Sequence, residues 1–226
     1  MAGSEREERG PAAAASLRAL VGELPADVRD RAVTHSSWTA RRIDSWGRLA
    51  FLGDAVLGLV VGATLFDRFP RSDIGRLTKI HGQAVSGRAC AEVALWLEVP
   101  ELLAARRECT GEVGITISEL LASERAMASI VESLIGAVYL DRGLEAVAPA
   151  VLAAFEPQIE HASKTMLDFK SALQELLARR GELVTYVVAE EDGPPHDRRF
   201  VVEATVDGAV LGNGSGASKK AAEQAA

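Results

Sequence analysis

Residues 48–57 read Arg-Leu-Ala-Phe-Leu-Gly-Asp-Ala-Val-Leu and place a single carboxylate, Asp54, inside an apolar run that extends to Leu65. An ionised carboxylate among apolar side chains is costly unless it is paired, hydrogen-bonded or bound to a metal ion. No proline interrupts the run before Pro70, so the stretch predicts one long helix. Asp54 is therefore a candidate functional residue on that helix.

The rest of the chain divides into two parts with different patterns. Hydrophobic residues make up 48% of the 226 residues and aromatic residues only 5%, which indicates a Leu-, Val- and Ala-rich core and favours helices as far as residue 155. A polar connection is expected over residues 156–165. Beyond it, a helix capped by Asp168 precedes alternating apolar patterns at 184–190 and 200–206, a short third strand at 209–211 and a helix capped by Ser218.

The bulk properties exclude several classes of protein. No run approaches the roughly 18 apolar residues of a membrane span, and the charged N-terminus does not have the pattern of a secretory signal. The two cysteines, Cys90 and Cys109, suggest neither a disulfide framework nor a metal-ligand spacing. A reduced, cytoplasmic protein is expected. The net charge of −7 argues mildly against a nucleic-acid partner, although binding depends on local charge.

Several motifs resemble the ribonuclease III family in order and spacing. Residues 48–57 resemble its signature helix, whose usual form is Asn-Glu-Arg-Leu-Glu-Phe-Leu-Gly-Asp-Ala-Val-Leu. The segments 34–37 (Thr-His-Ser-Ser), 75–79 (Gly-Arg-Leu-Thr-Lys) and 132–137 (Glu-Ser-Leu-Ile-Gly-Ala) follow the same family. Residues 168–177 and 212–226 resemble the two ends of a double-stranded RNA-binding domain. The resemblance covers residues 17–226 and implies an all-α endonuclease domain at 13–158, followed by a small α+β domain of order α-β-β-β-α at 168–226.

The resemblance also implies a metal site, but most of the family's acidic positions are changed here. In the family register, the six acidic positions fall on Gly47, Ala50, Asp54, Ile74, Ser129 and Glu132. Asp54 and Glu132 are expected to hold Mg²⁺ and the attacking water, with Ser129 a weak third ligand and Mn²⁺ a substitute metal. Asp44 and Asp73 are candidate sources of replacement oxygens, although both have the pattern of ordinary surface acids.

Further residues follow from the same resemblance. Lys219 and Lys220 are expected to contact RNA phosphates, while Gln174 and His196 are expected to reach the minor groove. Phe51 falls at a position that the family uses in a homodimer interface. Residues 166–226 carry seven basic and ten acidic side chains, so binding to RNA should be weak and sensitive to salt.

The sequence leaves three interpretations of function open. The first is a metal-dependent endoribonuclease that cuts double-stranded precursors such as rRNA and mRNA and leaves 5′-phosphomonoesters, with activity lowered by the missing carboxylates. The second is a protein that binds double-stranded RNA without cutting it. The third is a structural subunit of a ribonucleoprotein.

Overall fold

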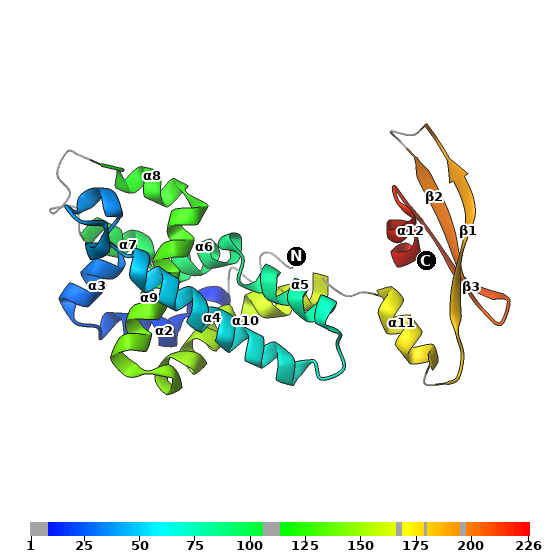
Figure 1. Cartoon of the computed structure of the whole chain (residues 1–226), viewed down its shortest axis with the longest axis horizontal. Helices are drawn as coiled ribbons and strands as arrows, with labels where there is room; N and C mark the ends of the chain where they lie inside the picture. Colours follow the sequence, from blue (N-terminus) through cyan, green and yellow to red (C-terminus); the bar gives the residue numbers. More distant parts are fainter. Residues whose placement is uncertain (1–8, 106–113, 166–168, 179, 195–197) are drawn as a thin grey trace. The chain divides into compact units, whose positions relative to one another are not determined.

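The structure, a computed structural model, describes residues 9–105, 114–165, 169–178, 180–194 and 198–226. It divides into two compact units, residues 1–165 and 166–226. The first is helical and the second combines helices with a three-stranded sheet, so the predicted fold class is confirmed (Figure 1).

The first unit is a bundle of α-helices. Two 3₁₀ turns, Ser36–Trp38 and Arg42–Asp44, lie between α3 and α4. The described helices are α2 (Ala15–Gly22), α3 (Ala26–Ala32), α4 (Gly47–Arg68), α5 (Ile74–Ala84), α6 (Gly87–Trp96), α7 (Val99–Ala105), α8 (Ile117–Ala122), α9 (Glu124–Arg142) and α10 (Leu144–Thr165).

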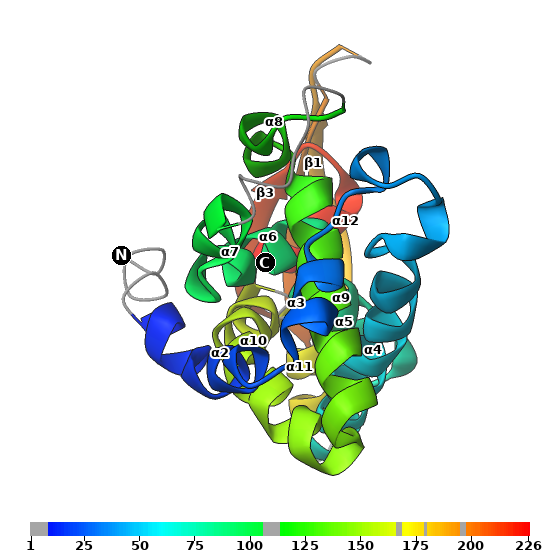
Figure 2. The same cartoon turned by 90° about the vertical axis from the view of Figure 1, so that its left-hand side faces the viewer.

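Helix α9 forms the centre of this bundle. Figure 2 shows it running through the middle of the unit with other helices around it. Every residue from Ser133 to Val138 is buried, as expected for a helix that is apolar on nearly all sides. The Ser123 hydroxyl caps its first turn by accepting a hydrogen bond from the backbone N–H of Ala126 at 3.2 Å. The helix ends before Gly143, whose φ of +78° suits glycine.

Helices α4 and α9 touch backbone to backbone at a pair of glycines. A Cβ atom on Gly53 would overlap the backbone carbonyl of Glu132, and one on Gly136 would overlap the backbone carbonyl of Leu49. Only residues without a side chain permit such a close approach. The crossing therefore fixes Asp54, which follows Gly53, beside the turn of α9 that carries Glu132.

The expected polar connection over residues 156–165 is wrong, because α10 continues to Thr165 with Pro157 inside the helix. The polar residues of this segment conceal an apolar face, since Phe155, Ile159 and Ala162 are fully buried. Packing of this face outweighs the hydrogen bond that a proline removes from a helix interior.

The second unit packs helices against an antiparallel sheet. It consists of α11 (Phe169–Ala178), β1 (Val184–Asp192), β2 (Arg199–Val206), β3 (Ala209–Gly216) and α12 (Lys219–Ala225), with strand order β1-β2-β3. Tyr186 of β1 pairs with Ala204 of β2, which sets the register of the first pair of strands. The expected tight turn between β2 and β3 is present, and both Asp207 and Gly208 have positive φ.

The third strand is longer than the three residues predicted from the sequence. It continues through alternating glycines at 212, 214 and 216, which face α12. A Cβ atom at Gly214 or Gly216 would collide with the backbone of α12, so the glycines allow the helix to lie directly on the sheet. Phe200, Val202 and Ala222 form the small core between them.

Helix α4 is the one described helix long and apolar enough to cross a membrane by length and composition. Core helices of bundles pass the same test. The buried side of α4, from Leu49 through Val56 and Val60 to Leu65, packs inside the first unit, so the bundle accounts for the apolar residues on this side of the helix.

Candidate active site

A hollow of about 460 Å³ opens in the first unit beside the crossing of α4 and α9. Two acids predicted from the sequence, Asp54 and Glu132, both line it. The complete lining is Ala50, Phe51, Asp54, Gly87, Glu124, Arg125, Ala128, Ser129 and Glu132. The hollow thus joins residues from α4, α9 and the first residue of α6.

Glu132 lies in an unusual electrostatic environment. Its side chain is half-buried, and this burial, together with the nearby Asp54 carboxylate, raises the pKa of Glu132 from 4.5 to about 7. Burial opposes the charged form, and a second negative charge adds to that effect. Asp54 remains exposed. At neutral pH the two acids therefore share a site in which Glu132 is poised between its protonated and ionised forms.

Cys90 of α6 lies close enough to the same two carboxylates for their charges to affect its pKa. Its thiol is fully buried, and burial together with Glu132 and Asp54 raises its pKa to about 12. A thiolate is the reactive form of cysteine, so Cys90 stays protonated and inert at neutral pH. It packs near the acids without acting as a nucleophile.

The other positions expected from the family register fall into two groups. Ala50 and the half-buried Ser129 line the hollow beside Asp54 and Glu132, whereas Gly47 and Ile74 lie outside it. Ile74 is 83% exposed at the first residue of α5. The structure therefore brings together four of the six expected positions, of which two carry a carboxylate.

The two candidate replacement acids have other roles. The Asp44 carboxylate accepts hydrogen bonds from the guanidinium of Arg41 at 2.8 and 2.9 Å, which lowers the pKa of Asp44. The Asp73 carboxylate accepts a hydrogen bond from the backbone N–H of Arg76 at 2.8 Å and caps α5. Both lie outside the lining of the hollow.

Sequence reasoning missed two charged residues in the lining, Glu124 and Arg125. Their spacing contains the signal, because residues 124, 128 and 132 lie four apart, as do 125 and 129, and such residues share a face of a helix. A Glu124 carboxylate oxygen lies 3.3 Å from the position that a Cβ on Gly87 would take, so this acid points toward the start of α6. In the parts of the chain that the structure describes, no three Asp, Glu, His or Cys side chains converge closely enough to hold a metal ion.

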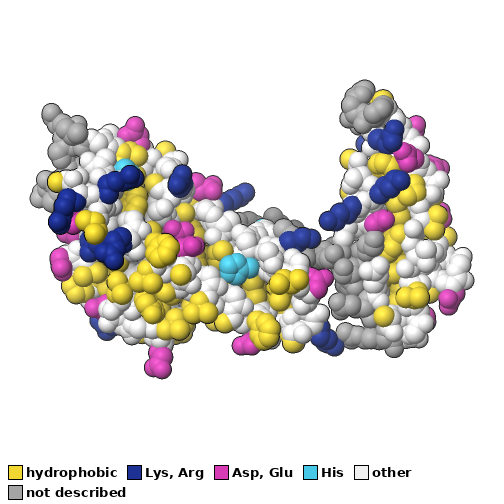
Figure 3. All heavy atoms as spheres, viewed as in Figure 1, with side chains coloured by type: hydrophobic (Ala, Val, Ile, Leu, Met, Phe, Trp, Pro, Cys, Tyr) yellow, Lys and Arg dark blue, Asp and Glu magenta, His cyan; other side chains and the backbone are white. Residues whose placement is uncertain are grey.

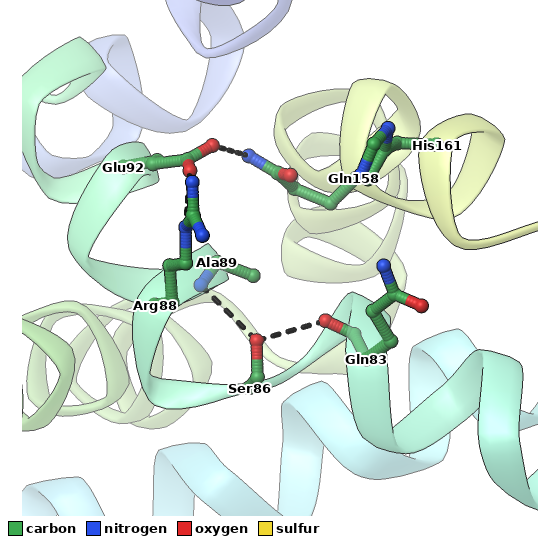
Figure 4. A pocket seen from close by; sticks show the side chains of 7 residues that line it. All are labelled: Gln83, Ser86, Arg88, Ala89, Glu92, Gln158 and His161. Carbon is green, nitrogen blue, oxygen red and sulfur yellow. Dashed lines mark hydrogen bonds and ion pairs between the residues drawn. The ribbon is translucent and has the colours of Figure 1, made fainter. Parts of the chain in front are cut away.

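A second, smaller hollow of about 180 Å³ lies between the α5–α6 turn and α10 (Figure 4). The Glu92 carboxylate accepts a hydrogen bond from the Gln158 amide at 3.1 Å and pairs with Arg88 at 3.3 Å. Ser86 caps α6 through the backbone N–H of Ala89. These polar groups satisfy one another, and none belongs to the set expected from the sequence.

The residues expected to contact RNA lie in the second unit. Gln174 is exposed on α11, and Lys219 and Lys220 are exposed at the start of α12, where Ser218 forms the predicted cap. The ammonium group of Lys219 lies 5.6 Å from the centre of the Phe200 ring and 3.9 Å from the Glu191 carboxylate. His196 and Asp168 fall outside the described residues.

An apolar stripe runs along the outer side of α4. It consists of Phe51, Ala55, Leu59, Ala63 and Phe66, which are all exposed, and is called the α4 stripe below. Phe51 is 82% exposed, Leu59 57% and Phe66 71%. Figure 3 shows hydrophobic side chains gathered over the part of the unit that carries α4. Exposed apolar patches of this kind mark contact surfaces in soluble proteins.

Comparison with known proteins agrees with this arrangement. A family model described as Ribonuclease-III-like matches residues 26–159, more than half of the chain. The chain belongs to the ribonuclease III family. A second model, described as the double-stranded RNA binding motif, matches residues 169–226.

Relatives in this family align over most of the chain. The chain is 40% identical over 223 residues to Ribonuclease 3 from Thermobifida fusca, covering 96% of this chain and 90% of that protein. It is 40% identical over 200 residues to Ribonuclease 3 from Streptomyces coelicolor, covering 87% of this chain and 70% of the relative.

Among solved structures, the nuclease domain of ribonuclease III from Campylobacter jejuni is similar to the first unit. Its TM-score is 0.52 at 26% identity, and the match covers 63% of this chain and 96% of that one. The description of that structure refers to a region involved in dimer formation of the nuclease domain.

Proposed function

We propose that this chain is an endoribonuclease that cuts double-stranded RNA at the hollow beside α4 and α9. The observation that carries the proposal is that Asp54 and Glu132 line one hollow, close enough for the Asp54 charge to raise the pKa of Glu132, in a chain that also matches a double-stranded RNA binding motif. Residues 13–158 form the cutting domain and residues 168–226 grip the duplex. The expected substrates are structured rRNA and mRNA precursors in the cytoplasm.

Two carboxylates suit a weakly held magnesium ion. Mg²⁺ prefers oxygen ligands and is usually held by one or two carboxylates together with phosphates of the substrate. Asp54 and Glu132 supply those carboxylates, and the Ser129 hydroxyl supplies a neutral third oxygen donor. Glu124 lines the same hollow, but within the described parts of the chain no three acidic, His or Cys side chains come close enough together to hold a metal ion, so affinity without RNA should be low. When bound, the ion lowers the pKa of water and neutralises charge on the scissile phosphate.

The reaction divides between the two acids. Water attacks the phosphorus and the bond to the 3′ oxygen breaks, leaving a 5′-phosphate on one product. Glu132 in its ionised form accepts a proton from that water, and the 3′ oxygen takes a proton from solvent to become a hydroxyl. Asp54, which is exposed in the hollow, orients the water and would help to hold the ion.

The second unit supplies affinity for the duplex. The exposed Lys219 and Lys220 contact phosphates in this proposal, and the exposed Gln174 reaches the minor groove from α11. His196 is proposed to reach a second minor groove from the loop between β1 and β2. A-form RNA is gripped in this way because its deep major groove cannot be read by side chains.

The α4 stripe supports a homodimer. It places exposed apolar side chains, Phe51 among them, on a helix that also lines the hollow. In a two-fold dimer each contact occurs twice, so a modest stripe contributes substantial stability. The dimer would carry two hollows, one for each strand of the duplex.

A competing proposal is a protein that binds double-stranded RNA without cutting it. The observation in its favour is the replacement of carboxylates by Ala50 and Ser129 inside the hollow itself. Retention of Asp54 and Glu132 in one hollow favours the nuclease.

A cleavage assay with a matched control separates the two proposals. Asp54→Asn should abolish cutting of a duplex RNA in either Mg²⁺ or Mn²⁺. Asp67→Asn, which alters an exposed acid on the same helix outside the hollow, should leave the rate unchanged. Equal activity of the natural protein and Asp54→Asn would exclude this hollow as the cutting site.

A further inference from the structure

The hollow contains one side chain whose charge is opposite to that of its acids. Arg125 lines it together with the carboxylates of Asp54, Glu124 and Glu132. Within the described residues it makes no ion pair or hydrogen bond, although three carboxylates line the same hollow, and its side chain is exposed. A free guanidinium is therefore available at the place where RNA is proposed to be cut.

The position of Arg125 gives this charge a specific neighbour. Arg125 precedes Ser129 by four residues on α9, so the two share one face of the helix. Side chains on a helix lean toward its N-terminus, which brings the Ser129 side chain toward Arg125. The family register implies a carboxylate at position 129, and a carboxylate there would pair with the guanidinium. Serine leaves the guanidinium unneutralised.

We propose that Arg125 binds the RNA phosphate in the hollow. Its guanidinium supplies positive charge in place of metal ions that the reduced set of carboxylates no longer recruits. The inference rests on the proposed nuclease function. A guanidinium presents a planar set of N–H donors that matches two phosphate oxygens and stays charged at every working pH. Such a donor stabilises the negative charge that grows on the phosphate during attack by water. Arg125 keeps its protons throughout and exchanges none with the substrate.

A double-mutant cycle tests the link between Arg125 and Ser129. Arg125→Ala should lower the single-turnover cleavage rate of the natural protein by about tenfold or more, the scale of losing one donor to the reacting phosphate. In a Ser129→Asp background the same change should cost less than about threefold, because the new carboxylate both neutralises the guanidinium and recruits metal. Arg125→Lys, which keeps the charge but loses the paired donors, should fall between. An equal loss in both backgrounds would overturn the proposal.

A binding measurement tests the phosphate contact without metal or turnover. In an Asp54→Asn background with EDTA, Arg125→Ala should weaken duplex RNA binding and flatten the log K against log salt slope by about one. The control is Arg142→Ala on the same helix, which lies about 25 Å further along α9 and outside the hollow. An unchanged slope for Arg125→Ala would contradict the phosphate contact.

The two measurements distinguish failure of this inference from failure of the proposed function. If the natural protein cuts RNA and Arg125→Ala cuts equally fast, the role of Arg125 is wrong and the nuclease proposal stands. If the natural protein cuts nothing in either metal, the nuclease proposal fails, and with it the catalytic role of Arg125. In that case only the slope of log K against log salt, measured for duplex RNA binding in EDTA, decides whether Arg125 contacts RNA.

Discussion

The glycine contact between α4 and α9 should be essential for stability, and Gly136→Ala tests it. The added methyl group would overlap the backbone carbonyl of Leu49 and lie 3.1 Å from the backbone nitrogen of Gly53. Backbone atoms cannot rotate away as a side chain can, so the helices must separate. Overpacking of this kind costs about 1–3 kcal/mol, and this site belongs at the upper end. The better helix propensity of alanine returns up to about 1 kcal/mol, leaving a net loss of about 2 kcal/mol.

Thermal unfolding followed by circular dichroism measures this loss. About 2 kcal/mol should lower the midpoint by about 4–8 °C for a unit of this size. Gly82→Ala is the matched control, because nothing lies within 4 Å of its Cβ position in α5, and it should raise the midpoint slightly. If Gly136→Ala melts at the same temperature as the natural protein, the close contact between α4 and α9 is not as described. If Gly82→Ala loses as much as Gly136→Ala, the loss does not come from the crossing.

Three further predictions concern charge, RNA binding and assembly. The Glu132 carboxyl of the folded, metal-free protein keeps its proton up to about pH 7, whereas the unfolded chain releases it near pH 4.5. The free energy of unfolding should therefore fall as the pH rises from 4.5 to 7, and Glu132→Gln should remove this pH dependence. An identical pH profile for both proteins would contradict the raised pKa. Replacing Lys219 and Lys220 by Ala should weaken binding to any duplex RNA and flatten the salt slope by about two, and unchanged affinity would exclude the contact. Phe51→Asp should convert a dimer into monomers in sedimentation experiments, and a natural protein that is monomeric at tens of micromolar would rule out the dimer.

The fold could be predicted because local patterns and tertiary packing agree in most of the chain. The apolar run through Asp54, the alternation in β1 and β2 and the Asp207-Gly208 turn each specify their own structure. The prediction failed where a residue has two possible roles. The glycines of β3 look like a loop by composition, but they serve the contact with α12. Pro157 looks like a helix stop, but the burial of Phe155 and Ile159 holds α10 together around it.

The candidate site was only partly accessible from the sequence. The resemblance to the family located Asp54 and Glu132, and the structure places both in one hollow. The resemblance did not point to Glu124 and Arg125. Their importance depends on the absence of a carboxylate at position 129 and on the way α9 faces the start of α6. The raised pKa of Glu132 likewise arises from burial and from Asp54, which are properties of the crossing of α4 and α9.

We propose that this hollow cuts double-stranded RNA with an incomplete set of carboxylates, and single-turnover cleavage of a duplex RNA is the decisive experiment. The natural protein should cut slowly in Mg²⁺ and faster in Mn²⁺, which generally binds oxygen and nitrogen sites more tightly than Mg²⁺. Ala50→Glu combined with Ser129→Asp should raise the Mg²⁺-dependent rate by about tenfold or more, since losses around a metal site cost on the order of 10–100-fold. If the natural protein and the double variant are both inert at millimolar Mn²⁺, although both remain folded and bind the duplex, the chain is an RNA-binding protein and the nuclease account is wrong.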